Sequence, residues 1–255
     1  MANPFAAAES AKIYARGRPD HHPRTIRHLA ALLPVGIPVD RALDVACGPG
    51  HSTRALQAIA RQVIGVDVVP AMVEFAASND DHRVAAARAE QLPFRQGQFA
   101  LVVVASGVHW FDQDGFVVEA RRVLTGDGVI AITEHFFLGQ MDDHSGFADW
   151  MRDSYTVRFP PPRRGTHLSV TDDIPEGFEV IGRDGWLDPI AMSLRQLVDY
   201  FLTQSNTIAA IDGGRGDRPS VSEWLISELH PFFDQDVART LLFWGSAITY
   251  RPHFG

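Results

Sequence analysis

Two stretches of the chain end in residue types that can bind a nucleoside-like ligand. The run from Leu43 to Gly50 closes an apolar segment with a glycine turn, where bare backbone can approach a ligand closely. Asp67 comes 17 residues after Gly50, at the end of a second apolar run, and its carboxylate can accept hydrogen bonds from both ribose hydroxyls. Residues 51–62 between them carry apolar side chains at helical spacing. This order of strand, glycine turn, helix, strand and acid predicts a βαβ cofactor site.

Two residues argue against a nicotinamide or flavin dinucleotide as the ligand. The dinucleotide pattern G-x-G-x-x-G needs a third glycine where helix and strand pack closely, and Thr53 takes that position here. Asp44 lies inside the end of the first strand, four residues before Gly48. A pyrophosphate gains nothing from a nearby carboxylate, whereas S-adenosylmethionine carries an ammonium and a sulfonium and does gain. Asp44 therefore either orients a ligand ammonium or hydrogen-bonds to backbone amides.

Longer runs resemble the successive cofactor motifs of the class I S-adenosylmethionine-dependent methyltransferases. They are D-V-A-C-G-P-G-H-S-T at 44–53, V-I-G-V-D-V-V-P-A-M-V-E at 63–74, and a segment at 87–112 that ends in V-A-S-G-V-H-W-F-D. The opening I-Y-A-R-G-R-P-D-H-H-P is similar to the N-terminal segment of the small-molecule branch that includes trans-aconitate methyltransferase. The resemblance is strong over residues 10–135, and it implies the cofactor and the fold.

The resemblance also implies which residues contact the cofactor. Asp67 binds the ribose, Ala89 and Glu90 lie at the adenine edge, and the Ser106 carbonyl meets the ligand ammonium. The alternative for Glu90 is a solvated surface acid. The implied cofactor-binding set is Tyr14, Arg18, Asp44, Ala46, Gly48, Gly50, Asp67, Val68, Met72, Ala89, Glu90, Ser106 and His109.

Residues 5–22 are predicted to form a lid that is mobile until the cofactor binds. Their turns and weak apolar periodicity leave this segment few contacts of its own. Tyr14 and Arg18 match lid positions of the resembled branch, where an aromatic ring and a cation close over the cofactor. The alternative is that both side chains lie on the surface.

His109 and Trp110 follow the predicted strand at 99–105, in the turn that faces the transferred methyl group in the resembled family. His109, the candidate catalytic residue, is either a general base with a near-neutral pKa or a wall of the cofactor pocket. Trp110 can present its ring to the sulfonium. Trp110 and Tyr200 are the candidate substrate contacts.

The predicted function is methyl transfer from S-adenosyl-L-methionine to an O, N or C nucleophile of a small molecule, by in-line displacement, with S-adenosyl-L-homocysteine as the product. A carboxylate acceptor needs no base. Arg158 and the pair Arg163-Arg164 would then clamp an anion or form a solvated basic loop. The alternative function is an S-adenosylmethionine-binding protein of the same fold that does not methylate, such as a cyclase or a regulator. A nicotinamide-dependent oxidoreductase is disfavoured.

The composition and net charge of the chain limit the kinds of partner and the location that we expect for it. The chain has 255 residues, 45% hydrophobic and 21% charged, and its formal charge is 23 − 31 = −8 without a basic cluster. These values argue against nucleic acid as a partner, and no apolar run approaches a membrane span. A single cysteine, Cys47, favours a cytoplasmic location. His21, His22 and His28 match no standard metal-site spacing, so no metal is expected.

Strands alternate with helices over the first half of the chain. Strands are predicted at 42–45, 63–67, 83–88, 99–105 and 128–133, and helices at 20–33, 51–62, 70–78 and 115–124. This alternation predicts an α/β fold with a doubly wound, mostly parallel, seven-stranded Rossmann-like sheet. The resembled fold implies that the last strand is antiparallel.

From His135 onward the regular alternation stops. Helical spacing continues at 147–157, 193–204 and 221–233, and strands are predicted at 186–192 and 241–250. We interpret the intervening helices as a helical cap insertion, because ligands bind at the carboxyl ends of the strands in open α/β sheets. The expected single domain comprises a lid and helix at 1–40, a cofactor-binding core at 41–135, a substrate cap at 136–235 and a final strand at 236–255.

Overall fold

The computed structural model describes residues 8–34, 36–78, 83–110, 112–161, 175–234 and 237–253. The chain divides into two compact units. Unit 1 comprises Met1–Pro19, Phe136–Arg163 and Leu187–Trp244, and unit 2 comprises Asp20–His135, Arg164–Trp186 and Gly245–Gly255. Among the described residues, no helix has both the length and the apolarity needed to cross a bilayer. The predicted division into lid, core, cap and final strand stays a prediction.

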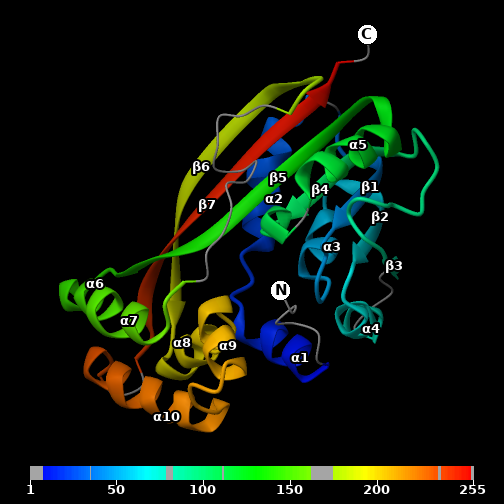
Figure 1. The fold of residues 1–255 in the computed structure, drawn as a ribbon. Coiled ribbons are helices and arrows are strands. Elements are labelled where there is room, and N and C mark those ends of the chain that lie inside the picture. The colour runs from blue at the N-terminus through cyan, green and yellow to red at the C-terminus, as the bar shows by residue number, and fades with distance from the viewer. Residues whose placement is uncertain are drawn as a thin grey trace. The chain divides into compact units, whose positions relative to one another are not determined.

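The described strands form a seven-stranded sheet in the order β3-β2-β1-β4-β5-β7-β6 (Figure 1). Their bounds are β1 Val39–Val45, β2 Ala60–Asp67, β3 Arg83–Ala86, β4 Phe99–Ala105, β5 Leu124–Met141, β6 Phe178–Met192 and β7 Arg239–Pro252. The pairs β1–β2, β2–β3, β1–β4 and β4–β5 are parallel. The predicted Rossmann-like sheet with an antiparallel last strand is confirmed. Its order reverses between β1 and β4, the kind of position where open α/β sheets bind ligands.

The central strands of unit 2 are buried on both faces. Leu43 of β1 and Val102 of β4 belong to the apolar layer that contains α5, whereas Ala42 and Leu101 belong to the layer that contains α2 and α3. This alternation is why residues 101–104 form an unbroken aliphatic run. The helices of unit 2 are α2 His22–Leu32, α3 His51–Leu56, α4 Pro70–Ser78 and α5 Gln113–Val123, with a 3-10 turn η1 at Val108–Trp110.

Unit 1 has a separate core that is rich in aromatic residues. Phe147, Tyr155 and Phe201 are buried together there. Trp150 is buried with them, and its ring N–H donates to the carboxylate of Glu228 at 2.9 Å, so the polar end of the ring is satisfied. The helices of unit 1 are α1 Ala8–Gly17, α6 Ser145–Trp150, η2 Met151–Tyr155, α7 Thr156–Arg158, α8 Leu194–Phe201, α9 Ser205–Asp212, α10 Arg218–Leu229 and η3 His230–Phe232.

Several predicted boundaries were wrong because pairing between distant segments overrides local pattern. The helix predicted at 51–62 ends at Leu56, since the backbone from Ala60 onward pairs with β1. The strand predicted at 83–88 ends at Ala86. β5 and β6 are both longer than predicted, and both lie beside β7, which is far from them in sequence.

The N-terminal segment contains a helix that the sequence pattern does not predict. Residues 8–17 form helix α1. Residues 5–7 lie outside the described part of the chain, and the closure of residues 5–22 over a cofactor stays a prediction. Gly17 explains how α1 fits against α8. A Cβ at this position would lie 2.6 Å from the Asp199 carbonyl oxygen, so a larger residue would force the two helices apart.

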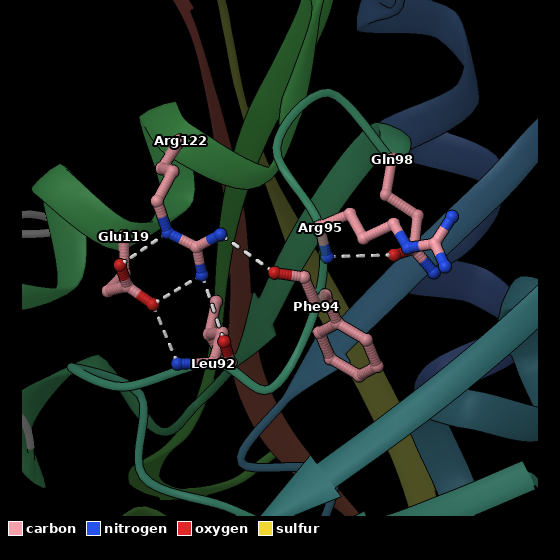
Figure 2. Close-up of polar contacts among 6 residues, drawn as sticks. All are labelled: Leu92, Phe94, Arg95, Gln98, Glu119 and Arg122. Atoms are coloured by element: carbon pink, nitrogen blue, oxygen red, sulfur yellow. Dashed lines mark hydrogen bonds and ion pairs between the residues drawn. The ribbon is translucent and has the colours of Figure 1, made fainter.

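A charged clamp holds the β3–β4 connection on α5 (Figure 2). Arg122 donates to the Glu119 carboxylate at 2.7 and 2.8 Å, to the Leu92 carbonyl at 2.9 Å and to the Phe94 carbonyl at 2.7 Å. Glu119 in turn accepts from the Leu92 N–H at 2.7 Å, and its pairing with Arg122 lowers its pKa. The clamp therefore fixes the chain directly after the turn at 88–91, which contains the predicted adenine-edge residues.

We predict that Arg122→Ala lowers the free energy of unfolding by about 2–3 kcal/mol, because two backbone carbonyls and a carboxylate lose their donor. Arg122→Lys should recover only part of this loss, since an ammonium cannot form the planar fork. Arg95→Ala, at an exposed position of the same connection, is the matched control and should change stability by less than about 0.5 kcal/mol. Urea unfolding measures all three, and equal values for Arg122→Ala and Arg95→Ala would contradict the clamp.

Candidate functional site

Asp44 is a fully buried acid at the carboxyl end of β1. The hydroxyls of Ser52 and Thr53 both donate to its Oδ2, each at 2.6 Å. Its Oδ1 is buried and has no hydrogen-bond partner in the described structure. Burial raises the pKa of Asp44 to about 6, against the lowering effect of the two hydroxyls. One oxygen of this carboxylate is therefore hydrogen-bonded, while the other is enclosed and receives no donor from the described residues.

Thr53 occupies the position where the dinucleotide pattern has its third glycine, and its hydroxyl donates to Asp44. The glycine that lets α3 pack closely on the sheet is instead Gly65 on β2. A Cβ on Gly65 would lie 2.9 Å from both Thr53 Oγ1 and Cys47 Sγ, so only glycine fits beneath α3 here. The function of the third glycine in the dinucleotide pattern is thus divided here: Thr53 on α3 supplies a hydroxyl, and Gly65 on β2 permits the close packing.

The glycine turn is tied to the second acid. Gly48 has a φ of 53° and Gly50 a φ of 92°, conformations that favour glycine. The Gly48 N–H donates to Asp67 Oδ2 at 2.9 Å, and the Val69 N–H donates to Asp67 Oδ1 at the same distance. Burial raises the pKa of Asp67, and these amides oppose the rise. Asp67 therefore fixes the turn while each oxygen retains a second lone pair for a ligand.

The ends of β1 and β4 are both strained. Among the described residues, Ala46 and Ser106 are the non-glycine residues with positive φ, at 58° and 55°. They lie directly after two neighbouring parallel strands, and a Cβ on Gly107 would lie only 2.8 Å from the Ala46 Cβ. Such strain concentrates at functional sites and is maintained by the surrounding structure. The structure thus brings together the turns that carry Asp44, Gly48 and Ser106.

The turn at 88–91 is hydrogen-bonded to the segment that follows β4. The Glu90 carboxylate accepts from the Asp112 N–H at 2.9 Å and lies 3.3 Å from Arg88 Nε, so it is held between the two segments that follow β3 and β4. Ala89 is buried in the layer that contains α5. At the neighbouring end of β2, Val68 is 54% exposed, whereas Met72 is buried on α4.

His109 and Trp110 lie in η1, after β4. Their ring centroids are 5.1 Å apart, and the Trp110 side chain is 50% exposed. The backbone N–H of Trp110 donates to the Gly107 carbonyl at 3.1 Å, which connects this turn to the strained end of β4. Both rings thus follow the Ser106 turn directly, and their catalytic and substrate roles stay predictions.

A row of histidines lies in the same unit. The His21 ring stacks on His135 at 3.7 Å and on His22 at 4.1 Å, and His22 faces His51 at 5.8 Å. The His22 charge lowers the pKa of Asp44, although burial dominates that group. His28 instead hydrogen-bonds to an aspartate of β6 at 2.7 Å. Across the described ranges, no three histidine, cysteine or acidic side chains meet in a metal-binding group.

Tyr14, Arg18 and Tyr200 belong to unit 1, where Arg18 contacts both rings. The Arg18 guanidinium lies 4.9 Å from the Tyr14 ring centroid and 5.2 Å from that of Tyr200. Tyr200 is buried. Arg158 lies over the Trp224 ring at 4.5 Å. The pair Arg163-Arg164, predicted as part of an anion clamp, lies outside the described residues.

Similarity to known proteins agrees with this fold. Residues 43–132 match the family model described as a methyltransferase domain. A Dictyostelium discoideum protein named as a methyltransferase is 26% identical over 195 residues, which are 73% of each chain. A malonyl-[acyl-carrier protein] O-methyltransferase of Geobacter sulfurreducens is 38% identical over 112 residues, which are 41% of this chain and 42% of that protein.

A solved structure from Anaeromyxobacter dehalogenans, described as a type II methyltransferase, has the same fold. Its TM-score is 0.72 at 23% identity, over 92% of this chain and 97% of the other. The family model, the named relatives and the shared fold together support a class I S-adenosylmethionine-dependent methyltransferase. The family implies S-adenosylmethionine as the methyl donor.

We predict that Asp44 makes the stability of the protein depend on pH. The folded-state pKa, about 6, is above the ordinary value of 3.8, so the folded state binds more protons between these values. The wild type should therefore lose about 2–3 kcal/mol of stability relative to Asp44→Asn as the pH rises from about 4 to about 6. Urea unfolding at several pH values tests this, and parallel profiles for the two proteins would contradict it.

Proposed function

We propose that the protein moves a methyl group from S-adenosylmethionine to an oxygen, nitrogen or carbon nucleophile of a small molecule. The observation that carries the proposal is the unpartnered Oδ1 of Asp44, buried beside Asp67 and the glycine turn. A buried acceptor without a partner fits a ligand that brings a donor, and S-adenosylmethionine brings an ammonium group. Two acids at this position also fit a positively charged nucleoside better than a pyrophosphate.

Each group at these strand ends is proposed to bind one part of the cofactor. Asp67 has a lone pair left on each oxygen, enough for the two ribose hydroxyls. Gly48 has open space where a Cβ would be, which leaves room for a ligand against its backbone. Asp44 and the Ser106 carbonyl would hold the amino group. The turn at 88–91 would lie at the adenine edge.

When bound, the cofactor supplies a methyl group that its sulfonium has already activated. The chain's own residues align donor and acceptor and exclude water, because effective concentration is the main source of acceleration in such a displacement. Trp110, half-exposed, offers a π face to a cation. His109 would take a proton only from an acceptor that arrives protonated, such as a phenol, an alcohol or an amine.

The acceptor is proposed to be a small molecule. The net charge of −8 and the lack of a basic cluster in the sequence disfavour nucleic acid. The Geobacter sulfurreducens relative is named for O-methylation of a malonyl group, and the match spans less than half of that protein. A carboxylate acceptor is one class that this name supports, and it would need no general base. Tyr200 in unit 1 stays a proposed acceptor contact.

We predict that the wild type binds S-adenosylhomocysteine at micromolar affinity and that Asp67→Ala weakens binding more than tenfold. Loss of a charge-assisted pair of hydrogen bonds costs about 1.5–3 kcal/mol. Asp40→Ala is the matched control, because Asp40 is an exposed acid near the opposite end of β1. Calorimetry gives the affinity and a thermal melt reports folding. A folded Asp67→Ala protein with unchanged affinity would remove Asp67 from the ribose role.

We predict that the effect of His109→Gln depends on the acceptor. Pools of acceptors are screened for S-adenosylhomocysteine release, and mass spectrometry identifies each product. For an acceptor that arrives protonated, kcat should fall about 10²–10⁴-fold while cofactor affinity stays nearly unchanged. For a carboxylate acceptor, kcat should stay near wild type.

His230→Gln is the control, because His230 is exposed in unit 1. If affinity and turnover fall together for every acceptor in His109→Gln, then His109 shapes the cofactor pocket and the base role is contradicted.

A further inference from the structure

The strand segments of unit 1 bury one face in the aromatic core and expose the other. β5, β7 and β6 lie side by side in the sheet (Figure 1), and side chains along each strand alternate between the two faces. Phe137 and Phe243 point into the core, where their ring centroids lie 5.0 Å apart. Phe136 and Trp244, one residue away on each strand, therefore point to the opposite face, and both are exposed.

Leu187 of β6 points to the same exposed face. A Cβ on Gly245 would lie 2.2 Å from the Trp186 ring, so these two residues of β7 and β6 are neighbours on the other side of the sheet. One residue away on each strand, Trp244 and Leu187 are then neighbours on the exposed side. Phe136 is 51% exposed, Leu187 47% and Trp244 37%. Three adjacent strands thus contribute one row of large apolar side chains.

The exposed face continues along the three strands without a charge. We define it as the nine alternate positions that start at 136, 187 and 240 and end at 140, 191 and 244. Seven of the nine residues are apolar and none is charged, although 21% of the chain is charged. The solvent side of an antiparallel sheet is ordinarily polar. A contiguous apolar surface of this kind marks an interaction site.

Charge and area favour a second copy of the chain as the occupant. The net charge of −8 opposes association of two copies in general, and the exposed face lets them meet without burying an acid. A flat, uncharged face is also self-complementary under two-fold symmetry. Its nine positions present roughly 500 Å² to solvent, so two copies bury about 1,000 Å² in total, the lower limit for a specific interface.

We propose that the exposed face is the interface of a weak homodimer, in which two copies pack these strands face to face. Sheets packed in this way lie about 10 Å apart, so the Trp244 ring of each copy reaches the opposite sheet. An area at the lower limit corresponds to a dissociation constant of about 1–100 μM. The proposal goes beyond methyl transfer, because the face contains none of the residues that we propose to bind the cofactor.

Sedimentation equilibrium of the full chain, between about 1 and 500 μM, tests the proposal. The wild type should pass from monomer to dimer over this range. Leu187→Glu and Trp244→Glu each place an acid on both copies at the interface, so each should weaken dimerisation at least tenfold. Val157→Glu is the matched control, because Val157 is an exposed apolar residue of unit 1 outside the face. It should dimerise like the wild type.

Folding and cross-linking provide independent measurements. Leu187→Glu should melt at the wild-type temperature when both are dilute and monomeric, because its side chain is exposed. It therefore carries the test even if Trp244→Glu fails to fold. Cys47 is the one cysteine of the chain and is buried. A bismaleimide should therefore join copies of the Trp244→Cys variant at the engineered thiol, and leave Val157→Cys mostly uncoupled.

A wild type that stays monomeric over the whole range would overturn the proposal. So would a dimer that is equally strong in both glutamate variants and in the control. If a monomeric wild type binds the apolar dye anilinonaphthalene sulfonate and Leu187→Glu does not, the face belongs to an apolar ligand instead. S-adenosylhomocysteine affinity should be the same in Leu187→Glu and the wild type, so failure of the dimer and failure of the proposed function are separate results.

Discussion

A carboxylate that is shut off from water must find its hydrogen-bond donors inside the protein, and Asp44 imposes this demand at the end of β1. Ser52 and Thr53 meet half of it, both at Oδ2. Their hydroxyls can reach Asp44 only because α3 begins directly after the glycine turn and packs closely on the sheet. Gly65 makes that packing possible. The unmet half, at Oδ1, is the feature on which the proposed binding of a cationic ligand depends.

The second acid and the strained strand ends depend on the same close approach. Asp67 accepts from the Gly48 amide and so holds the turn against β2, while the contact between Ala46 and Gly107 brings the β4 turn alongside. Positive φ at two non-glycine residues is costly, and the packed strands beneath them maintain it. Rigid strands therefore position the backbone and carboxylate groups that a methyl-transfer enzyme needs for alignment. Mobile side chains therefore contribute little to the positioning of these groups.

The sequence was sufficient where the signals were local. The glycine turn, Asp67 and the alternating core all lie within short windows, so the cofactor-binding half could be predicted. In the sequence, Thr53 stands out only as a missing glycine, because a hydroxyl that bonds to an acid nine residues earlier cannot be told from any other polar residue of a helix. The ends of β5 and β6 depend on β7, far along the chain.

The measurement closest to the central claim is the number of protons exchanged when S-adenosylmethionine binds. Calorimetry at pH 6 in two buffers of different ionisation enthalpy gives that number. If an ammonium group pairs with Asp44, whose pKa is about 6, binding at pH 6 should release a fraction of a proton, and Asp44→Asn should abolish that release. The same release from the wild type and from Asp44→Asn, or none from either, would contradict the account.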